Sequence, residues 1–140
     1  MIIMIMTQSM NYLAAHVVMV VRHEETAFWI IAALVETFFV GYYADRLPMF
    51  LLDQGIFVRT VEKQLPELAK RMAEFPGGTE TFVPLWFLCS YVNSFSTSQS
   101  ARVWDLLFLG ARTHGAIAAP AILIQVSCIF MSCVFILSYN

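Results

Sequence analysis

The chain has 140 residues, enough for one domain with a single hydrophobic core. Hydrophobic residues make up 59% of it and charged residues 13%, whereas soluble domains contain about 25% charged residues. We therefore expect some apolar surface to face a partner, further sequence or lipid. The net charge is -2 and the eight Lys and Arg residues are scattered, so no basic surface for nucleic acid is expected.

The cysteines and histidines form no pattern that predicts a metal site or a disulfide framework. The three cysteines are odd in number and lie in apolar stretches, which is typical of buried, reduced thiols in a cytosolic protein. The three histidines are too far apart in the sequence to suggest zinc ligands or a catalytic triad. These residues are Cys89, Cys128, Cys133, His16, His23 and His114.

The first part of the chain predicts two helices after an abrupt apolar start. Residues 1–7 are too few for a signal peptide and carry no basic residue. From Ser9 to Val21, apolar residues recur every three or four positions, which predicts a helix that Ser9 is placed to cap. A second helix is predicted to begin at the charged cluster 22–25, whose carboxylates suit a positive helix end, and to stop near Gly41.

Two more helices follow in the middle of the chain. Residues 49–64 carry apolar side chains at a spacing of four, which is typical of one helix face. The next helix is predicted to begin with Pro66 and Glu67 and to end after Lys70 and Arg71. Proline in a first turn, an early acid and late bases all match the ends of a helix.

The remaining elements complete an all-α pattern. A loop at 75–78 precedes residues 82–92, which are nearly all apolar and predict a short buried helix. After the polar loop 93–100, residues 101–109 predict a helix that ends at Gly110. Strand-like alternation and internal repeats are lacking, so we predict an irregular bundle of about six or seven helices.

The apolar tail allows two interpretations. Residues 117–137 contain no charge and are long enough to cross a bilayer as a helix. If they do, the preceding domain is cytosolic and the protein is tail-anchored. Alternatively, 116–140 contains a final core helix that is apolar because it is buried on all sides or because the chain ends prematurely.

Seven blocks, in order, resemble the TBC domain family. They are Gln8-Ser9-Met10-Asn11-Tyr12, Glu24-Glu25-Thr26-Ala27-Phe28-Trp29, Leu34-Val35-Glu36, Asp53 with Phe57, Leu65-Pro66-Glu67-Leu68, Trp86-Phe87-Leu88, and Arg102-Val103-Trp104-Asp105 followed by Leu107-Phe108. The resemblance covers residues 8 to about 110, and we take 8–115 as a partial TBC domain.

The resemblance implies a regulator of vesicle trafficking rather than an enzyme. TBC domains accelerate GTP hydrolysis on Rab-type GTPases, so the expected partner is such a GTPase, which itself carries the GTP and Mg. No cofactor of the chain's own is expected. The expected location is the cytoplasm, at the surface of endomembranes.

The resemblance also implies a site with two side chains, an arginine and a glutamine. Gln8 matches the glutamine, and the rest of its block, Ser9, Met10, Asn11 and Tyr12, is expected to support it. None of the seven residues before Gln8 is basic, and Met6 stands where the family usually has a tyrosine. We therefore expect the start of the domain to be missing and the activity of these residues to be weak or lost.

Other residues of the blocks are expected to serve as structural anchors. The tryptophans should bury large areas in the core, Arg102 and Asp105 should fix helix ends, and Glu25 should match a helix dipole. The full set is Glu25, Phe28, Trp29, Trp86, Arg102, Trp104 and Asp105.

Two alternatives remain open at the level of sequence. The chain could keep the fold and act only as a GTPase-binding scaffold. It could also be a small polytopic membrane protein, because residues 26–44 are nearly all apolar. Glu36 argues against the second alternative, since a carboxylate near the centre of a span costs about 2.5 to 3.5 kcal/mol.

Overall fold

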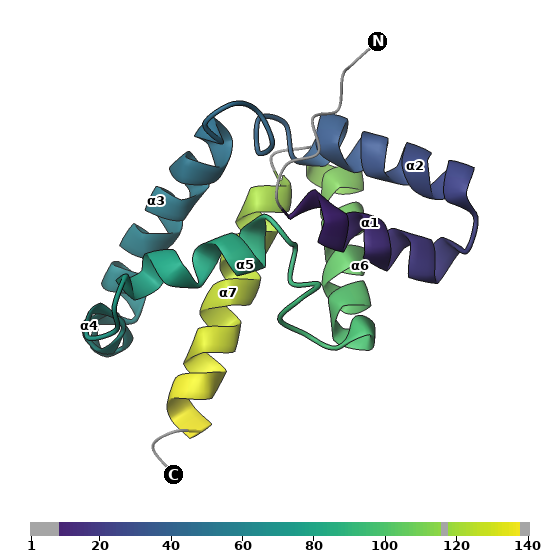
Figure 1. The fold of residues 1–140 in the computed structure, drawn as a ribbon. Helices are drawn as coiled ribbons and strands as arrows, with labels where there is room; N and C mark the ends of the chain where they lie inside the picture. Colours follow the sequence, from purple (N-terminus) through teal and green to yellow (C-terminus); the bar gives the residue numbers. More distant parts are fainter. Residues whose placement is uncertain (1–8, 116–117, 138–140) are drawn as a thin grey trace.

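The computed structural model describes residues 9–115 and 118–137, and this part of the chain is all helical, which confirms the predicted fold class. These ranges contain seven α-helices and no strand, and Figure 1 shows how the helices are arranged. Their bounds are α1 Met10–Val21, α2 Glu24–Ala33, α3 Pro48–Gln64, α4 Pro66–Ala73, α5 Val83–Phe87, α6 Thr97–His114 and α7 Ala118–Leu137. A π-helical turn, η1 (Leu34–Phe38), extends α2, and a 3₁₀ turn, η2 (Gly78–Thr81), precedes α5.

Helices α1 and α2 form an antiparallel hairpin (Figure 1). Arg22 ends α1 in a left-handed conformation, with φ of 55°. His23 then caps α2, because its ring nitrogen Nδ1 accepts a hydrogen bond from the backbone N–H of Thr26 at 3.3 Å. Glu24 and Glu25 occupy the first turn of α2, as predicted.

Helices α3 to α5 each begin with a proline in the first turn. α4 has the predicted ends, with Glu67 early and two basic residues late. α5 is shorter than the predicted helix 82–92, because Ser90 and Tyr91 adopt left-handed φ values of 44° and 65° that a continuing helix does not allow. The segment is buried as expected, although Leu85 is exposed.

Helix α6 differs from its prediction at both ends. It begins earlier, because Ser96 and Gln99 form a capping box in which each side chain bonds to the other residue's backbone N–H. It also continues through Gly110 and ends at Gly115, which has a φ of 75°. Gly110 lies inside the helix next to α7, and a Cβ there would lie 2.3 Å from Cδ1 of Ile122.

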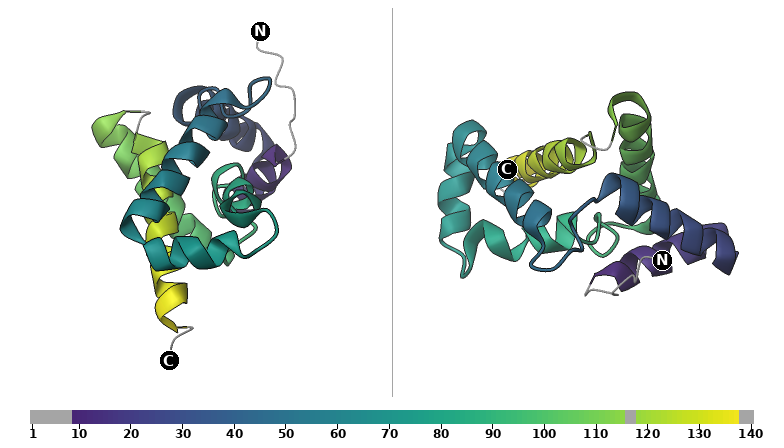
Figure 2. Two further views of the ribbon diagram at one scale, coloured as in Figure 1. Left: turned by 90° about the vertical axis from the view of Figure 1, so that its left-hand side faces the viewer. Right: turned by 90° about the horizontal axis from the view of Figure 1, so that it is seen from above.

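Helix α7 packs against the centre of the fold. It runs between α3 and α6 in the two views of Figure 2, and it contacts α3, α5 and α6. Ala119, Leu123 and Ser127 on its inner face are inaccessible to solvent, whereas Ile129 is exposed. The helix is therefore a core element that is buried along one face rather than on all sides.

None of the helices in the described ranges is long and apolar enough to cross a membrane.

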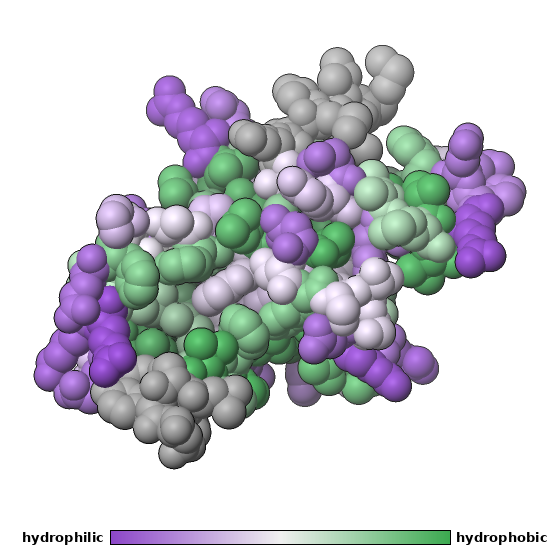
Figure 3. Space-filling view, turned by 60° about the horizontal axis from the view of Figure 1, so that its bottom comes forward, coloured by the Kyte–Doolittle hydropathy of each residue, from purple (hydrophilic) through white to green (hydrophobic). Residues whose placement is uncertain are grey.

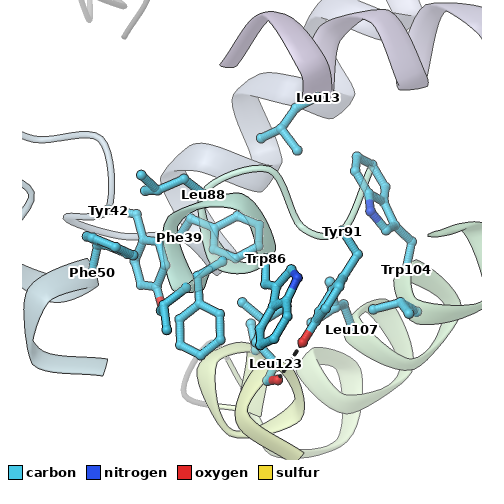
Figure 4. Close-up of a cluster of buried hydrophobic side chains, with 14 of the residues drawn as sticks. Leu13, Phe39, Tyr42, Phe50, Trp86, Leu88, Tyr91, Trp104, Leu107 and Leu123 are labelled. Atoms are coloured by element: carbon cyan, nitrogen blue, oxygen red, sulfur yellow. Dashed lines mark hydrogen bonds between the residues drawn. The ribbon is translucent and has the colours of Figure 1, made fainter. Parts of the chain in front are cut away.

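The core is aromatic and continuous from α1 to α7 (Figure 4). At its centre Phe57, Phe87 and Tyr91 are fully buried. Apolar side chains are also common on the outside, and Figure 3 shows one face on which they occupy much of the area between hydrophilic edges. Trp29, for example, is 63% exposed. The high hydrophobic content is thus divided between one core and an apolar surface.

Candidate functional site

The predicted catalytic Gln8 lies outside the described residues, and the described part of its block begins at Ser9, where α1 starts. Ser9 has a φ of 99°, an uncommon conformation for a residue with a Cβ. Its carbonyl accepts a hydrogen bond from the backbone N–H of Tyr12 at 3.1 Å. Its side chain makes no capping hydrogen bond, so the predicted capping role is wrong.

The residues after Ser9 divide between core and surface. Met10 is buried, whereas Asn11 and Tyr12 are exposed, Tyr12 to 44%. Cys89 is buried. Burial raises the pKa of its thiol, and the nearby Ser9 side chain opposes that rise. The start of α1 thus lies against the core through Met10 and presents the polar groups of Asn11 and Tyr12 to solvent.

Cys89 belongs to a turn, residues 88–91, whose backbone oxygens are held by three side chains from distant elements. The hydroxyl of Tyr43 donates to the carbonyl of Leu88 at 2.7 Å. The indole N–H of Trp104 donates to the carbonyl of Ser90 at 3.1 Å. The hydroxyl of Ser100 donates to the carbonyl of Tyr91 at 3.2 Å. These bonds fix the surface against which Ser9 lies.

Tyr91 links this turn to α7 (Figure 4). Its ring stacks on Phe95 at a centroid distance of 4.8 Å, and its hydroxyl donates to the carbonyl of Leu123 at 3.2 Å. The same hydroxyl lies against the hydroxyl of Ser127. Ser127 and Ser90 are both fully buried. Within the described residues, the Ser90 hydroxyl has no hydrogen-bond partner. The start of α1 is thus connected through one turn to the last helix of the bundle.

The predicted anchors separate into two groups. Trp86 and Trp104 are 7% and 6% exposed, as expected of core anchors. Phe28 and Trp29 are 51% and 63% exposed, so their prediction as core anchors is wrong. α2 buries the face that carries Ala27 and Ile31. Trp29 lies on the opposite side of the helix, and Phe28 lies at the edge of the buried face.

The charged anchors also differ from their prediction. Arg102 and Asp105 lie within α6, where they form an exposed ion pair with an N–O distance of 3.7 Å. They do not fix a helix end, and an exposed pair of this kind contributes at most about 1 kcal/mol. Glu25 is exposed in the first turn of α2, the position that suits a dipole interaction.

The sequence did not predict that two polar side chains are buried. His16, on α1, is 2% exposed, and its ring centroid lies 4.9 Å from that of Trp104. Asp53, on α3, is 5% exposed and accepts a hydrogen bond from the hydroxyl of Tyr42. The position of each residue in its helix could have predicted this burial. His16 follows the buried Leu13 at helical spacing, and Asp53 precedes the buried Phe57 at helical spacing.

His16 predicts a pH dependence of stability. Burial lowers its pKa below the ordinary 6.5, so the unfolded chain binds a proton more readily than the folded chain. The contribution of His16 is therefore favourable above pH 6.5 and is lost as the pH falls below it. We expect the free energy of unfolding, measured with urea, to fall between pH 7.5 and 5.5 less steeply in His16→Gln than in the original chain. Equal slopes would contradict this assignment.

Within the described residues, no group of three His, Cys, Asp or Glu side chains is arranged to hold a metal ion. The chemistry available near α1 is instead that of hydrogen bonding from exposed amide and hydroxyl groups, those of Asn11 and Tyr12.

Comparison with known proteins places this arrangement in a family. The sequence model of the Rab-GTPase-TBC domain matches residues 6–137, a range that includes α7. The chain is 29% identical over 101 residues to growth hormone-regulated TBC protein 1 of Xenopus tropicalis, covering 72% of this chain and 30% of that protein. Its counterpart in Rattus norvegicus is 30% identical over 101 residues, covering 72% of this chain and 35% of that protein.

A third relative is Carabin of Mus musculus, 31% identical over 81 residues, which cover 58% of this chain and 18% of that protein. The chain therefore spans about a third or less of the curated relatives it matches. No solved structure matches it. Because the family match covers most of the sequence and agrees with the helical fold, the chain belongs to the Rab-GTPase-TBC domain family.

Proposed function

We propose that this chain binds a GTP-loaded Rab-type GTPase and that Gln8 contributes to the hydrolysis of the bound GTP. The observation that carries the proposal is the family match over residues 6–137, which includes Gln8. Support comes from the start of α1, where Asn11 and Tyr12 are exposed next to the buried Met10. The proposed place of action is the cytoplasmic surface of endomembranes, where Rab-type partners are held.

The chemistry of phosphoryl transfer explains why a glutamine suits this role. Catalysis consists of orienting the attacking water and stabilising charge on the phosphate oxygens. An amide carbonyl accepts a hydrogen bond from the water, while its NH₂ group donates to the phosphate, and the side chain carries no charge that must be desolvated. Gln8 has both groups.

We expect these 140 residues to lack the side chain that stabilises the charge on the phosphate oxygens. An arginine contributes about 10³ to 10⁵ in rate when it reaches the transferred phosphate. No arginine stands among residues 1–7, upstream of Gln8, which is where the family resemblance places it. We therefore expect the chain by itself to bind its GTPase and to accelerate hydrolysis only weakly.

The test is to measure binding and single-turnover hydrolysis with a panel of GTP-loaded Rab-type GTPases. We expect at least one member to bind and its hydrolysis to be accelerated by less than about 10³. Gln8→Ala should retain that affinity and lose the remaining acceleration, because the amide acts on the water and not on the complex as a whole.

Gln64→Ala is the matched control, since Gln64 is an exposed glutamine at the end of α3. It should change neither quantity. Acceleration above about 10³ would contradict the expected weak activity. Binding without any effect of Gln8→Ala on turnover would favour a non-catalytic scaffold, and failure of every GTPase to bind would overturn the proposal.

A further inference from the structure

A groove lined by α3 and α7 contains a buried carboxylate that forms no ion pair with the described residues. The groove has a volume of about 460 Å³ and lies between η1, α3 and α7. Its walls are apolar and include Leu52, Ile56 and Ile124. The groove is also lined by one acidic residue, Asp53, which is only 5% exposed.

The hydrogen bonds of Asp53 are incomplete. The hydroxyl of Tyr42 donates to Oδ2, and within the described residues no other hydrogen bond and no ion pair is made by this side chain. Among the described residues, the hydroxyl of Ser90 is the one side-chain polar atom that is both fully enclosed and without a partner. Oδ1 of Asp53 also has no partner, so it must be accessible to solvent. A carboxylate that is buried to this extent is ordinarily paired with a cation. The free oxygen of Asp53 is thus a polar acceptor in an otherwise apolar groove.

The entrance to this groove is apolar as well. Val40, Met49, Leu52 and Ile56 border it and are between 40% and 59% exposed. An occupant that fits both parts must present a cation to Asp53 and an apolar stem to these side chains. A metal ion fails the second condition, and a neutral hydrocarbon fails the first. An alkylammonium ion satisfies both.

We propose that this groove binds a small organic ammonium ion, with its NH₃⁺ group donating to Oδ1 of Asp53 and its alkyl stem lying against Leu52, Ile56 and Ile124. Burial raises the pKa of Asp53, and a bound cation would favour the ionised carboxylate. The bond from Tyr42 holds the carboxylate in place, so one oxygen is fixed for the ligand. The site is separate from the proposed GTPase-binding function and does not depend on it.

The molecule contains an internal comparison for this proposal. A second groove of about 460 Å³ lies between α4 and α7, and its apolar walls include Met72 and Met131. Its described lining residues include the guanidinium of Arg71 and no carboxylate. The two grooves are therefore similar in size, but among the described residues only the first is lined by a carboxylate, so they should differ in their preference for an ammonium ion.

The experiment is an NMR titration of the methionine and isoleucine methyl groups with hexylammonium chloride and, separately, with 1-hexanol. We expect hexylammonium to shift the signals of Met49, Ile56 and Ile124 in a saturable manner, with a Kd of roughly millimolar order. The signals of Met72 and Met131 should not follow the same curve. Hexanol should bind the first groove about tenfold more weakly, because it lacks the charge.

Asp53→Asn is the decisive variant, since it keeps the shape and an acceptor for Tyr42 but removes the charge. We expect it to abolish the preference for hexylammonium over hexanol. Asp45→Asn, at a fully exposed acid, should leave that preference unchanged. If Asp53→Asn does not fold, Leu52→Lys places a tethered ammonium at the entrance and should weaken hexylammonium binding by competition.

Three outcomes would overturn the proposal. They are equal affinity of the original chain for hexanol and hexylammonium, equal shifts in both grooves, and an unchanged preference in Asp53→Asn.

Discussion

Replacing Trp86 with alanine is expected to lower the free energy of unfolding by about 3–5 kcal/mol. The indole is 7% exposed and lies in ring contact with Phe57, Phe82 and Phe130, which come from α3, the segment before α5, and α7. Its removal leaves a cavity where three segments meet. Because domains of this size are stable by about 5–15 kcal/mol, the loss is a large part of the total.

Trp29→Ala is the matched control for this prediction. Trp29 is 63% exposed, and its ring contacts that of the neighbouring Phe28. We expect its replacement to change stability by less than about 0.5 kcal/mol, as for most surface substitutions. Urea unfolding followed by circular dichroism measures both variants, and Trp86→Phe gives an intermediate loss if Trp86→Ala does not fold. Equal losses in the two alanine variants would contradict the assigned core.

The different positions of these two tryptophans show what the sequence could not decide. In α2 apolar residues occur on every side, so periodicity alone did not identify the buried face. Phe28 and Trp29 were expected to be core anchors, whereas the structure buries Ala27, Ile31 and then Leu34. The buried face of α2 is the one that α1 covers, and the position of α1 is not encoded within the ten residues of α2.

Helix ends were predictable where the signal is local. Pro66, Glu67 and the late bases of α4 gave its limits correctly, because each acts on its own helix end. The serine-rich loop before α6 was harder to interpret. Ser96 is the cap because Gln99 stands three residues later and returns its hydrogen bond, while Ser100 is buried and bonds to Tyr91 instead.

The candidate site was predictable only in part, for a similar reason. The family blocks identified Gln8, whose position lies outside the described residues, and they identified Trp86 and Trp104. The turn that carries Cys89 was not identified as a support for Ser9 because the two residues are 80 positions apart. Proximity between two residues so far apart has no periodic signal in the sequence.

Gly110→Leu is expected to separate α6 from α7 and to lower the free energy of unfolding by about 1–3 kcal/mol. Replacing a glycine within a helix ordinarily stabilises the protein, since a residue with a side chain favours the helix by up to about 1 kcal/mol. At Gly110 that gain is outweighed, because a Cβ would meet Ile122 at 2.3 Å and Ala118 at 3.4 Å. Movement of the Ile122 tip relieves part of the first contact, but the larger side chain also displaces α7.

Gly55→Leu provides the opposite case on α3. A Cβ at Gly55 has no neighbour within 4 Å, and the position is exposed. The same substitution should therefore stabilise the protein by up to about 1 kcal/mol. Urea unfolding of both variants tests the two signs together. A gain in both would show that α6 and α7 do not depend on close approach at Gly110.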